Sequence, residues 1–137
     1  TADKDLLESL KITRENPYVL NYLAYSWLER NYKIELSMEM LKEAYDLRKN
    51  DPYITDSLGW GYYLINDFEN AEKYLKKAVE LMPYDPIVND HYGDILWMLN
   101  RKIQARYFWN NVLNLEETDD EMKINVKKKI IYGIEKT

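Results

Sequence analysis

Cysteine is absent from this chain, and so are long apolar runs and any excess of basic residues. Without cysteine the chain forms no disulfide and offers no thiolate site. No apolar run approaches the ~20 residues that a membrane-spanning helix needs. The 24 acidic residues outnumber the 19 basic residues and give a net charge of −5. Such a chain gains nothing from releasing the counterions of phosphates, so we expect no nucleic-acid partner.

Motifs of catalysis and cofactor binding are missing as well. The segment 59–61 (Gly-Trp-Gly) lies inside a predicted helix and no Lys-Ser or Lys-Thr pair follows it, which excludes a phosphate-binding loop. Ser57, His91 and Asp94 supply the residue types of a catalytic triad, but without a nucleophile elbow or oxyanion device. His91 with Asp90 and Asp94 is a weak metal signal, which an ordinary hydrogen-bonded cluster explains better. We therefore expect no enzyme activity, no metal and no cofactor.

A repeat with a period of 34 or 35 residues is present instead. The dipeptides Asn16-Pro17, Asp51-Pro52 and Asp85-Pro86 are spaced by 35 and then 34 residues. In each of them, Asn or Asp can cap a helix, and Pro fits the first helical position because its missing N–H is not needed there. The three dipeptides therefore predict three helix starts at one period.

The segment 51–84 shows the repeat most clearly. Two antiparallel helices that cross closely need small residues at the crossing and large residues beside it, and a proline after the second helix ends it. These requirements are met by Leu58, Gly59, Tyr62, Ala71, Leu75, Ala78 and Pro83. The segment is therefore predicted to be a helical hairpin.

Laid over the whole chain, the period predicts five segments. Residues 1–15 align with the second helix of a preceding, truncated repeat, or form an N-terminal cap. Three full hairpins are expected over 16–50, 51–84 and 85–117. A single helix of about 12–15 residues is marginal in water, so the hairpins should gain stability by stacking on their neighbours. Residues 118–137 are expected to form a C-terminal capping helix.

The sequence of the last segment suits a capping helix. Thr118 and Glu121 form a predicted capping box at its start. An apolar stripe is expected to face the hairpins, consisting of Val126, Ile130, Ile131 and Ile134. The lysine run 127–129 is expected largely on the solvated side.

The pattern of the middle hairpin resembles that of the tetratricopeptide repeat (TPR) family, W-x2-L-G-x2-Y…A-x3-F…P. Thr55 stands where Trp is usual, and Leu75 stands where Phe is usual. The resemblance implies an all-α, right-handed solenoid of about three helix-turn-helix repeats with a flanking helix at each end. It also implies a scaffold for protein–protein interaction that has no chemistry of its own.

A narrower resemblance is carried by Asn21–Trp27, Asp56–Trp60 and Asn89–Asp94 together with Ala105-Arg106. These stretches are similar to the C-terminal repeats of bacterial multi-TPR proteins, several of which are envelope-associated lipoproteins. The resemblance favours the bacterial periplasm or envelope and leaves the cytoplasm open. Some of these relatives are adaptors that bring substrates to carboxyl-terminal processing proteases.

In TPR superhelices the first helix of each repeat lines a concave groove, and the resemblance implies the ligand-binding residues of this chain. The set is mainly aromatic and acidic and contains no Lys or Arg: Asn21, Tyr22, Tyr25, Tyr53, Asp56, Trp60, Tyr63, Asp90, His91, Asp94 and Trp97. It lacks the basic clamp with which some TPR domains hold a C-terminal carboxylate. Tyr and Trp offer large contact area at little cost in side-chain entropy.

The carboxylates of Asp56, Asp90 and Asp94 favour a ligand that carries Lys, Arg or a free amine. We therefore expect the partner to be a protein or peptide that is apolar with some positive charge. Three other aromatic residues occupy packing positions of the repeat and are expected in the core: Trp27, Tyr62 and Trp109.

Two alternatives to a peptide-binding groove stay open on the sequence. The first is a structural segment that stacks on other repeats or self-associates through an exposed terminal helix. The second is an adaptor for a processing protease.

Overall fold

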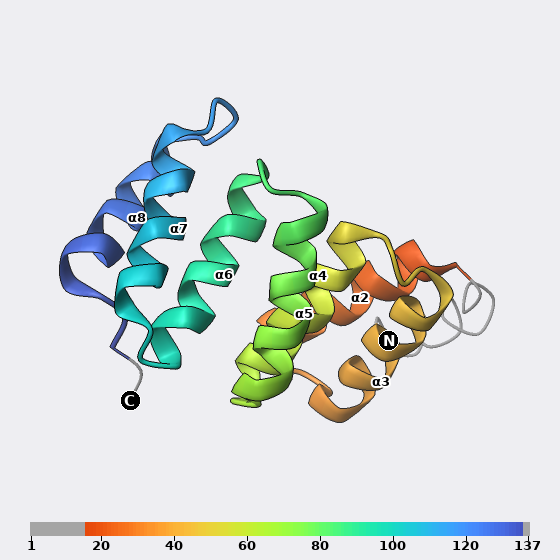
Figure 1. Cartoon of the computed structure of the whole chain (residues 1–137). Helices are drawn as coiled ribbons and strands as arrows, with labels where there is room; N and C mark the ends of the chain where they lie inside the picture. The colour runs from red at the N-terminus through yellow and green to blue at the C-terminus, as the bar shows by residue number, and fades with distance from the viewer. Residues whose placement is uncertain (1–15, 136–137) are drawn as a thin grey trace.

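The computed structural model describes residues 16–135, and the expectation for residues 1–15 lies outside them. In this described part of the chain, seven helices follow one another along an elongated array, with α2 and α3 at one end and α8 at the other (Figure 1). Within the described range there is no β-strand. The helices are α2 (Pro17–Glu29), α3 (Ile34–Leu47), α4 (Pro52–Leu64), α5 (Phe68–Leu81), α6 (Pro86–Met98), α7 (Lys102–Asn114) and α8 (Asp120–Tyr132).

The three predicted helix starts are confirmed, and each has its predicted cap. The side chain of Asn16 accepts hydrogen bonds from two backbone N–H groups of α2, and Asp51 does the same for α4. Asp85 accepts from the N–H of Val88 in α6. Each of these caps stabilises its helix by about 1 kcal/mol, because it pairs N–H groups that the helix itself leaves open.

Consecutive helices pack as hairpins, α2 with α3, α4 with α5 and α6 with α7, and each hairpin packs on the next. The first helices also contact one another, α2 with α4 and α4 with α6, whereas within the described residues the second helices pack mainly against first helices. The first helices therefore form the inner layer of the array. All described helices are too short or too polar to cross a membrane.

Small residues lie at the helix crossings, as the repeat pattern predicts. A Cβ atom on Gly59 would lie 2.7 Å from Cγ of Leu75 and 2.9 Å from its backbone nitrogen, so α4 and α5 approach as closely as they do only with glycine there. A Cβ on Gly93 would lie 2.5 Å from the ring of Trp109. Trp27 and Trp109 are buried in the core as predicted. Tyr62, which was expected there too, is half-buried.

The start of α8 differs from the predicted capping box. The N-cap is Asp119, whose carboxylate accepts a hydrogen bond from the N–H of Met122. The hydroxyl of Thr118 instead donates to the carbonyl oxygen of Val112, at 2.6 Å, in a buried position. The hydroxyl of Thr118 therefore pairs with a backbone carbonyl near the end of α7 and does not cap α8.

The inner face of α8 also differs from the predicted stripe. Val126 is fully buried and Ile130 and Ile134 pack against the core, but Ile131 is 66% exposed. Lys129, which was expected largely on the solvated side, points inward to α6.

Candidate interaction surface

The residues predicted to line the groove all lie on the inner helices α2, α4 and α6, but they differ widely in exposure. Tyr22 and Tyr53 are exposed, by 72% and 55%. The half-buried members are Asn21, Tyr25, Trp60, Asp90 and Trp97. The buried members are Asp56, Tyr63, His91 and Asp94. The inner face is therefore open along α2 and at the start of α4, and largely filled along α6.

The seam between α4 and α6 is filled by a buried ion pair and a stack of rings. Nδ1 of His91 donates to the carboxylate of Asp56, at 2.9 Å from Oδ2. The ring of Trp60 lies between two others, with its centroid 3.9 Å from that of His91 and 4.5 Å from that of Tyr63. These four side chains therefore join two repeats.

The imidazole of His91 is held in its charged form by this arrangement. Burial by itself lowers the pKa of a histidine, but the Asp56 carboxylate, with smaller contributions from Asp94 and Asp90, raises the pKa of His91 above its ordinary value of 6.5. The stabilisation from this pair is therefore fully present below pH 6.5 and is lost as the pH rises through the pKa of the folded state.

This protonation state can be measured directly, because the chain contains one histidine. We expect the imidazole Hε1 resonance in NMR to titrate above pH 6.5 in the parent protein. In an Asp56→Asn variant, burial is no longer opposed by the nearest carboxylate, so the pKa of His91 should fall by at least about one unit. An unchanged pKa in a folded variant would contradict the pairing.

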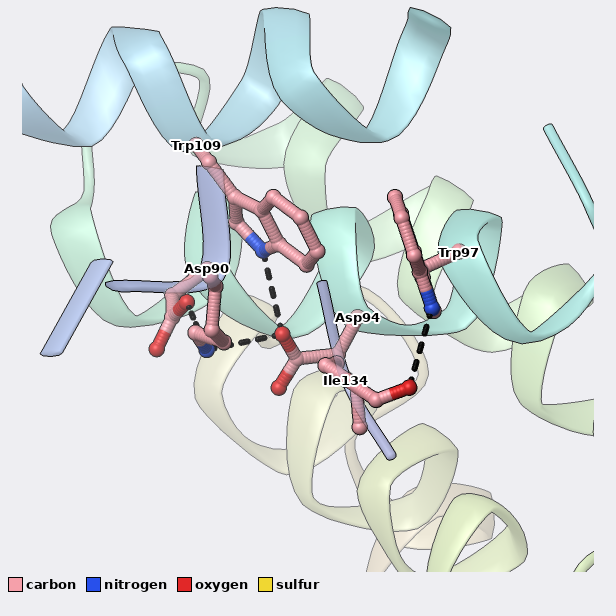
Figure 2. Close-up of polar contacts among 6 residues, drawn as sticks. Asp90, Asp94, Trp97, Trp109 and Ile134 are labelled. Carbon is pink, nitrogen blue, oxygen red and sulfur yellow. Dashed lines mark hydrogen bonds and ion pairs between the residues drawn. The ribbon is translucent and has the colours of Figure 1, made fainter. Parts of the chain in front are cut away.

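The two acidic residues of α6 are paired with a lysine of α8. Nζ of Lys129 lies 2.5 Å from Oδ1 of Asp90 and 2.8 Å from Oδ1 of Asp94. Figure 2 shows the indole N–H of Trp109 directed at Asp94, to whose Oδ1 it donates at 3.0 Å. The same ammonium group lies 5.5 Å from the centroid of the Trp109 ring. The carboxylates expected to attract a basic ligand are thus bound to a basic residue of the chain itself.

The pKa values of this cluster follow from its burial and its two negative charges. Burial, and then repulsion by Asp90, raises the pKa of Asp94 to about 6, although Lys129 opposes the shift. Burial lowers the pKa of Lys129, but Asp94 and Asp90 outweigh that effect, and the net direction is upward. At neutral pH, Lys129 is therefore charged and holds a buried carboxylate in its ionised form.

Trp97 is also covered by Gly133 and Ile134, which follow α8. Its indole N–H donates to the carbonyl oxygen of Ile134 at 3.1 Å (Figure 2). Gly133, with φ +73°, lies so close that a Cβ there would be 2.0 Å from the Trp97 ring. The guanidinium of Arg106 lies 5.0 Å from the ring centroid. Trp97 therefore anchors the capping helix.

Lys129 is the residue that the sequence interpretation missed. The signal for it was its spacing, three residues after the buried Val126 and one before Ile130, which places it near the inner face of α8. It was nevertheless expected on the solvated side, because charged residues are rarely buried unless they are paired.

The open part of the inner face is a stripe along α2. Tyr18, Tyr22, Tyr25 and Glu29 follow one another at spacings of four, three and four residues, which places them on one side of the helix. Tyr18 is 54% exposed, and Tyr22 is exposed further still. Burial, and then a hydrogen bond to Glu29, raises the pKa of the half-buried Tyr25. The stripe thus offers aromatic surface beside one carboxylate.

Asn21 lies next to this stripe and carries an unusual atom. Its side-chain oxygen is buried and has no hydrogen-bond partner among residues 16–135. The equivalent positions of α4 and α6 are Asp56 and Asp90, which both have cationic partners.

Among the described residues, no three His, Asp or Glu side chains gather as metal ligands.

Comparison with known proteins shows which proteins have a similar architecture. No protein-family model matches the chain. A TPR repeat-containing protein of Pseudomonas aeruginosa is 33% identical over 73 residues, which are 53% of this chain and only 12% of that protein. A thermophilic TPR protein of Thermus thermophilus has a solved structure that matches with a TM-score of 0.78 at 17% identity, over 93% of this chain and 71% of that one. The chain has the fold of a TPR array.

Two other solved structures with this fold contain a bound peptide. The first TPR of Spaghetti (RPAP3), bound to an HSP90 peptide, matches this TPR array with a TM-score of 0.70 at 19% identity, over 82% of this chain and 88% of that one. The Yersinia enterocolitica type III secretion chaperone SycD, in complex with a peptide of the translocator YopD, has a TM-score of 0.70 at 16% identity, over 82% and 87% of the two chains.

Proposed function

We propose that this TPR array is a protein-interaction module that binds a peptide or a partner's segment along α2 and the start of α4. The observation that carries the proposal is the exposure of Tyr18 and Tyr22 on the inner layer, beside Tyr25 and Glu29. Large aromatic side chains with a polar tip supply much contact area at low entropic cost. Two structures of the same fold hold peptides, which supports a binding role.

The arrangement of charges narrows the chemistry of the ligand. Asp56 is paired with His91, and Asp90 and Asp94 are paired with Lys129, so these three carboxylates attract a basic ligand only if it displaces the resident cation. Glu29 is exposed and lies at the end of the tyrosine stripe. We infer a ligand with an apolar or aromatic side chain against the tyrosines and a basic group near Glu29.

The proposal can be tested by affinity capture from a bacterial lysate with matched variants. The test variant is Tyr18→Ala with Tyr22→Ala, and the control is Ile131→Ala with Tyr132→Ala on α8, where the two side chains are 66% and 77% exposed. Exposed substitutions of this kind change stability little, so both variants should stay folded. We expect the partner to be retained by the parent and the control and depleted at least about tenfold by the test variant, a loss of about 1.4 kcal/mol.

Trp60 and Asp94 are unsuitable for this test, although both belong to the predicted groove. Trp60 is stacked between two rings, and Asp94 is buried in an ion pair, so substitution there would alter stability together with binding. Equal capture by the parent and the Tyr18, Tyr22 variant would contradict the proposed site.

The control variant also addresses the alternative of an assembly segment. Ile124, Ile131 and Tyr132 are exposed on α8, at the end of the array, where a second copy or a further repeat would stack. Loss of the partner, or of a dimer in light scattering, in the Ile131, Tyr132 variant alone would favour that function. Recovery of a processing protease among the captured proteins would support the narrower adaptor alternative.

A further inference from the structure

A second recessed surface lies at the edge of the array, away from the α2 stripe. The α5–α6 and α7–α8 connections lie at the same edge, the upper one in Figure 1. A hollow of about 610 Å³ between them is lined by both connections and by Tyr53. A neighbouring hollow of about 510 Å³ shares Tyr84 and Leu115 with the first and extends to α7. We name the combined surface the edge groove, defined by Tyr53, Tyr84, Tyr107, Leu115, Glu116 and Glu117.

The edge groove presents aromatic side chains that the packing of the repeats leaves exposed. Tyr84 is 80% exposed, Tyr107 is 62% exposed, and Tyr53 is also more than half exposed. These tyrosines come from three different elements, the α5–α6 connection, α7 and α4, yet they line two adjoining hollows. Exposed apolar surface gathered around a hollow is typical of an interaction site, whereas single exposed tyrosines are ordinary.

The walls of the edge groove are held in place by hydrogen bonds between residues that are close in sequence. Asp85 caps α6, and the side-chain amide of Asn89 donates to the carbonyl oxygens of Pro83 and Asp85, both at 2.9 Å. In the α7–α8 connection, the hydroxyl of Thr118, which follows the lining residue Glu117, donates to the carbonyl oxygen of Val112. A surface that is already ordered loses less entropy when a partner binds.

The charges around the edge groove are all of one sign. Glu116 and Glu117 line the first hollow and are exposed, and Glu80 lines the second. Asp85 is also a lining residue, although its carboxylate is occupied as a helix cap. Among residues 16–135, no Lys or Arg lines either hollow. Such a surface repels phosphates and other acidic partners and attracts ammonium and guanidinium groups.

We propose that the edge groove is a second binding surface, for an extended peptide segment that carries an apolar side chain next to Lys or Arg. The apolar side chain lies against Tyr84 and Leu115, and the basic group reaches Glu116 and Glu117. The exposed side chain of Asn114 lines both hollows. Its Nδ2 donates to the carbonyl oxygen of Asn110 at 3.1 Å, and its Oδ1 would accept from an N–H of the peptide backbone. The edge groove shares Tyr53, at the start of α4, with the surface proposed along α2, but Tyr18 and Tyr22 line neither hollow, so substitutions at these two tyrosines distinguish the two surfaces.

The test is a selection of randomised ten-residue peptides, displayed on phage, against the immobilised parent protein. Selected clones are then titrated against two variants. The edge variant is Tyr84→Ala with Glu116→Lys and Glu117→Lys, and the comparison variant is Tyr18→Ala with Tyr22→Ala. All five substituted side chains are exposed, and circular dichroism with thermal melting verifies that each variant is folded.

We expect a class of clones that carries an apolar residue beside Lys or Arg. This class should bind the edge variant at least tenfold more weakly than the parent and bind the comparison variant equally well. Its affinity should also fall with rising salt, because carboxylates contribute to it. The proposal is overturned if no clone is enriched, if every clone binds the edge variant as tightly as the parent, or if the edge-dependent clones are acidic. If all enriched clones lose binding only to the comparison variant, the α2 site is supported and the edge groove is overturned.

Discussion

Replacing Lys129 with methionine is expected to destabilise the array by about 2–4 kcal/mol at pH 8 and by much less at pH 5. The substitution keeps the unbranched chain out to Cε and removes the ammonium group, which leaves Asp94 buried without its cation. The pKa of Asp94 is already raised to about 6 and should rise further in the variant. A raised carboxylate pKa means that stability is highest when the group is protonated and is lost as the pH rises through the pKa of the folded state.

Urea denaturation at the two pH values measures this effect, and Lys127→Met is its matched control. Lys127 lies on the same helix and carries the same charge, but it is exposed. The control should change the free energy of unfolding by no more than about 0.5 kcal/mol at either pH. Equal losses in both variants, or a loss for Lys129→Met that does not depend on pH, would contradict the role given to Lys129.

Replacing Gly59 with alanine is expected to destabilise the array by about 2 kcal/mol, even though alanine is the better helix former by about 1 kcal/mol. The new Cβ would lie 2.9 Å from the backbone nitrogen of Leu75, so α4 and α5 must separate. A change at this crossing affects the contact between the helices along their length, because cores are close-packed.

Gly61 offers the matched control for this prediction on the same helix. A Cβ there would meet only the ends of flexible side chains, 2.8 Å from Sδ of Met38 and 2.9 Å from Cδ1 of Leu41, which can turn aside. Gly61→Ala should therefore be close to neutral, and the difference between the two variants in urea denaturation should exceed about 1.5 kcal/mol. Equal stabilities of the two variants would contradict the close crossing at Gly59.

Local features were predicted from the sequence because their causes are local. The caps Asn16, Asp51 and Asp85 act on N–H groups two or three residues away, and spacing alone reveals them. Gly59 was found because the repeat pattern places a small residue at each crossing. The cap of α8 was harder to assign, because Thr118 and Asp119 are both good capping residues. In the structure the hydroxyl of Thr118 is bound to the carbonyl oxygen of Val112, and Asp119 is the cap.

Exposure of the groove residues could not be predicted in the same way, because it depends on what packs against them. Asp90 and Asp94 occupy positions on the inner layer, as the repeat pattern implies, but α8 supplies Lys129 to both. Asp56 and His91 are 35 residues apart and meet only when two repeats stack. The repeat period places Pro83 and Asp85 in the α5–α6 connection, but it carries no signal that Tyr84, Glu116 and Glu117 line a common surface, so the edge groove was visible only in the assembled array.

The most direct test of the central claim, that this array binds a partner's segment along α2, is amide hydrogen exchange with and without the captured partner. Exchange reports local opening and covering of backbone amides helix by helix. We predict slower exchange of the α2 amides and of the first turn of α4 in the complex, with α8 unchanged. Unchanged exchange throughout α2, with protection confined to α7 and α8, would contradict the account and place the binding surface at the C-terminal end of the array.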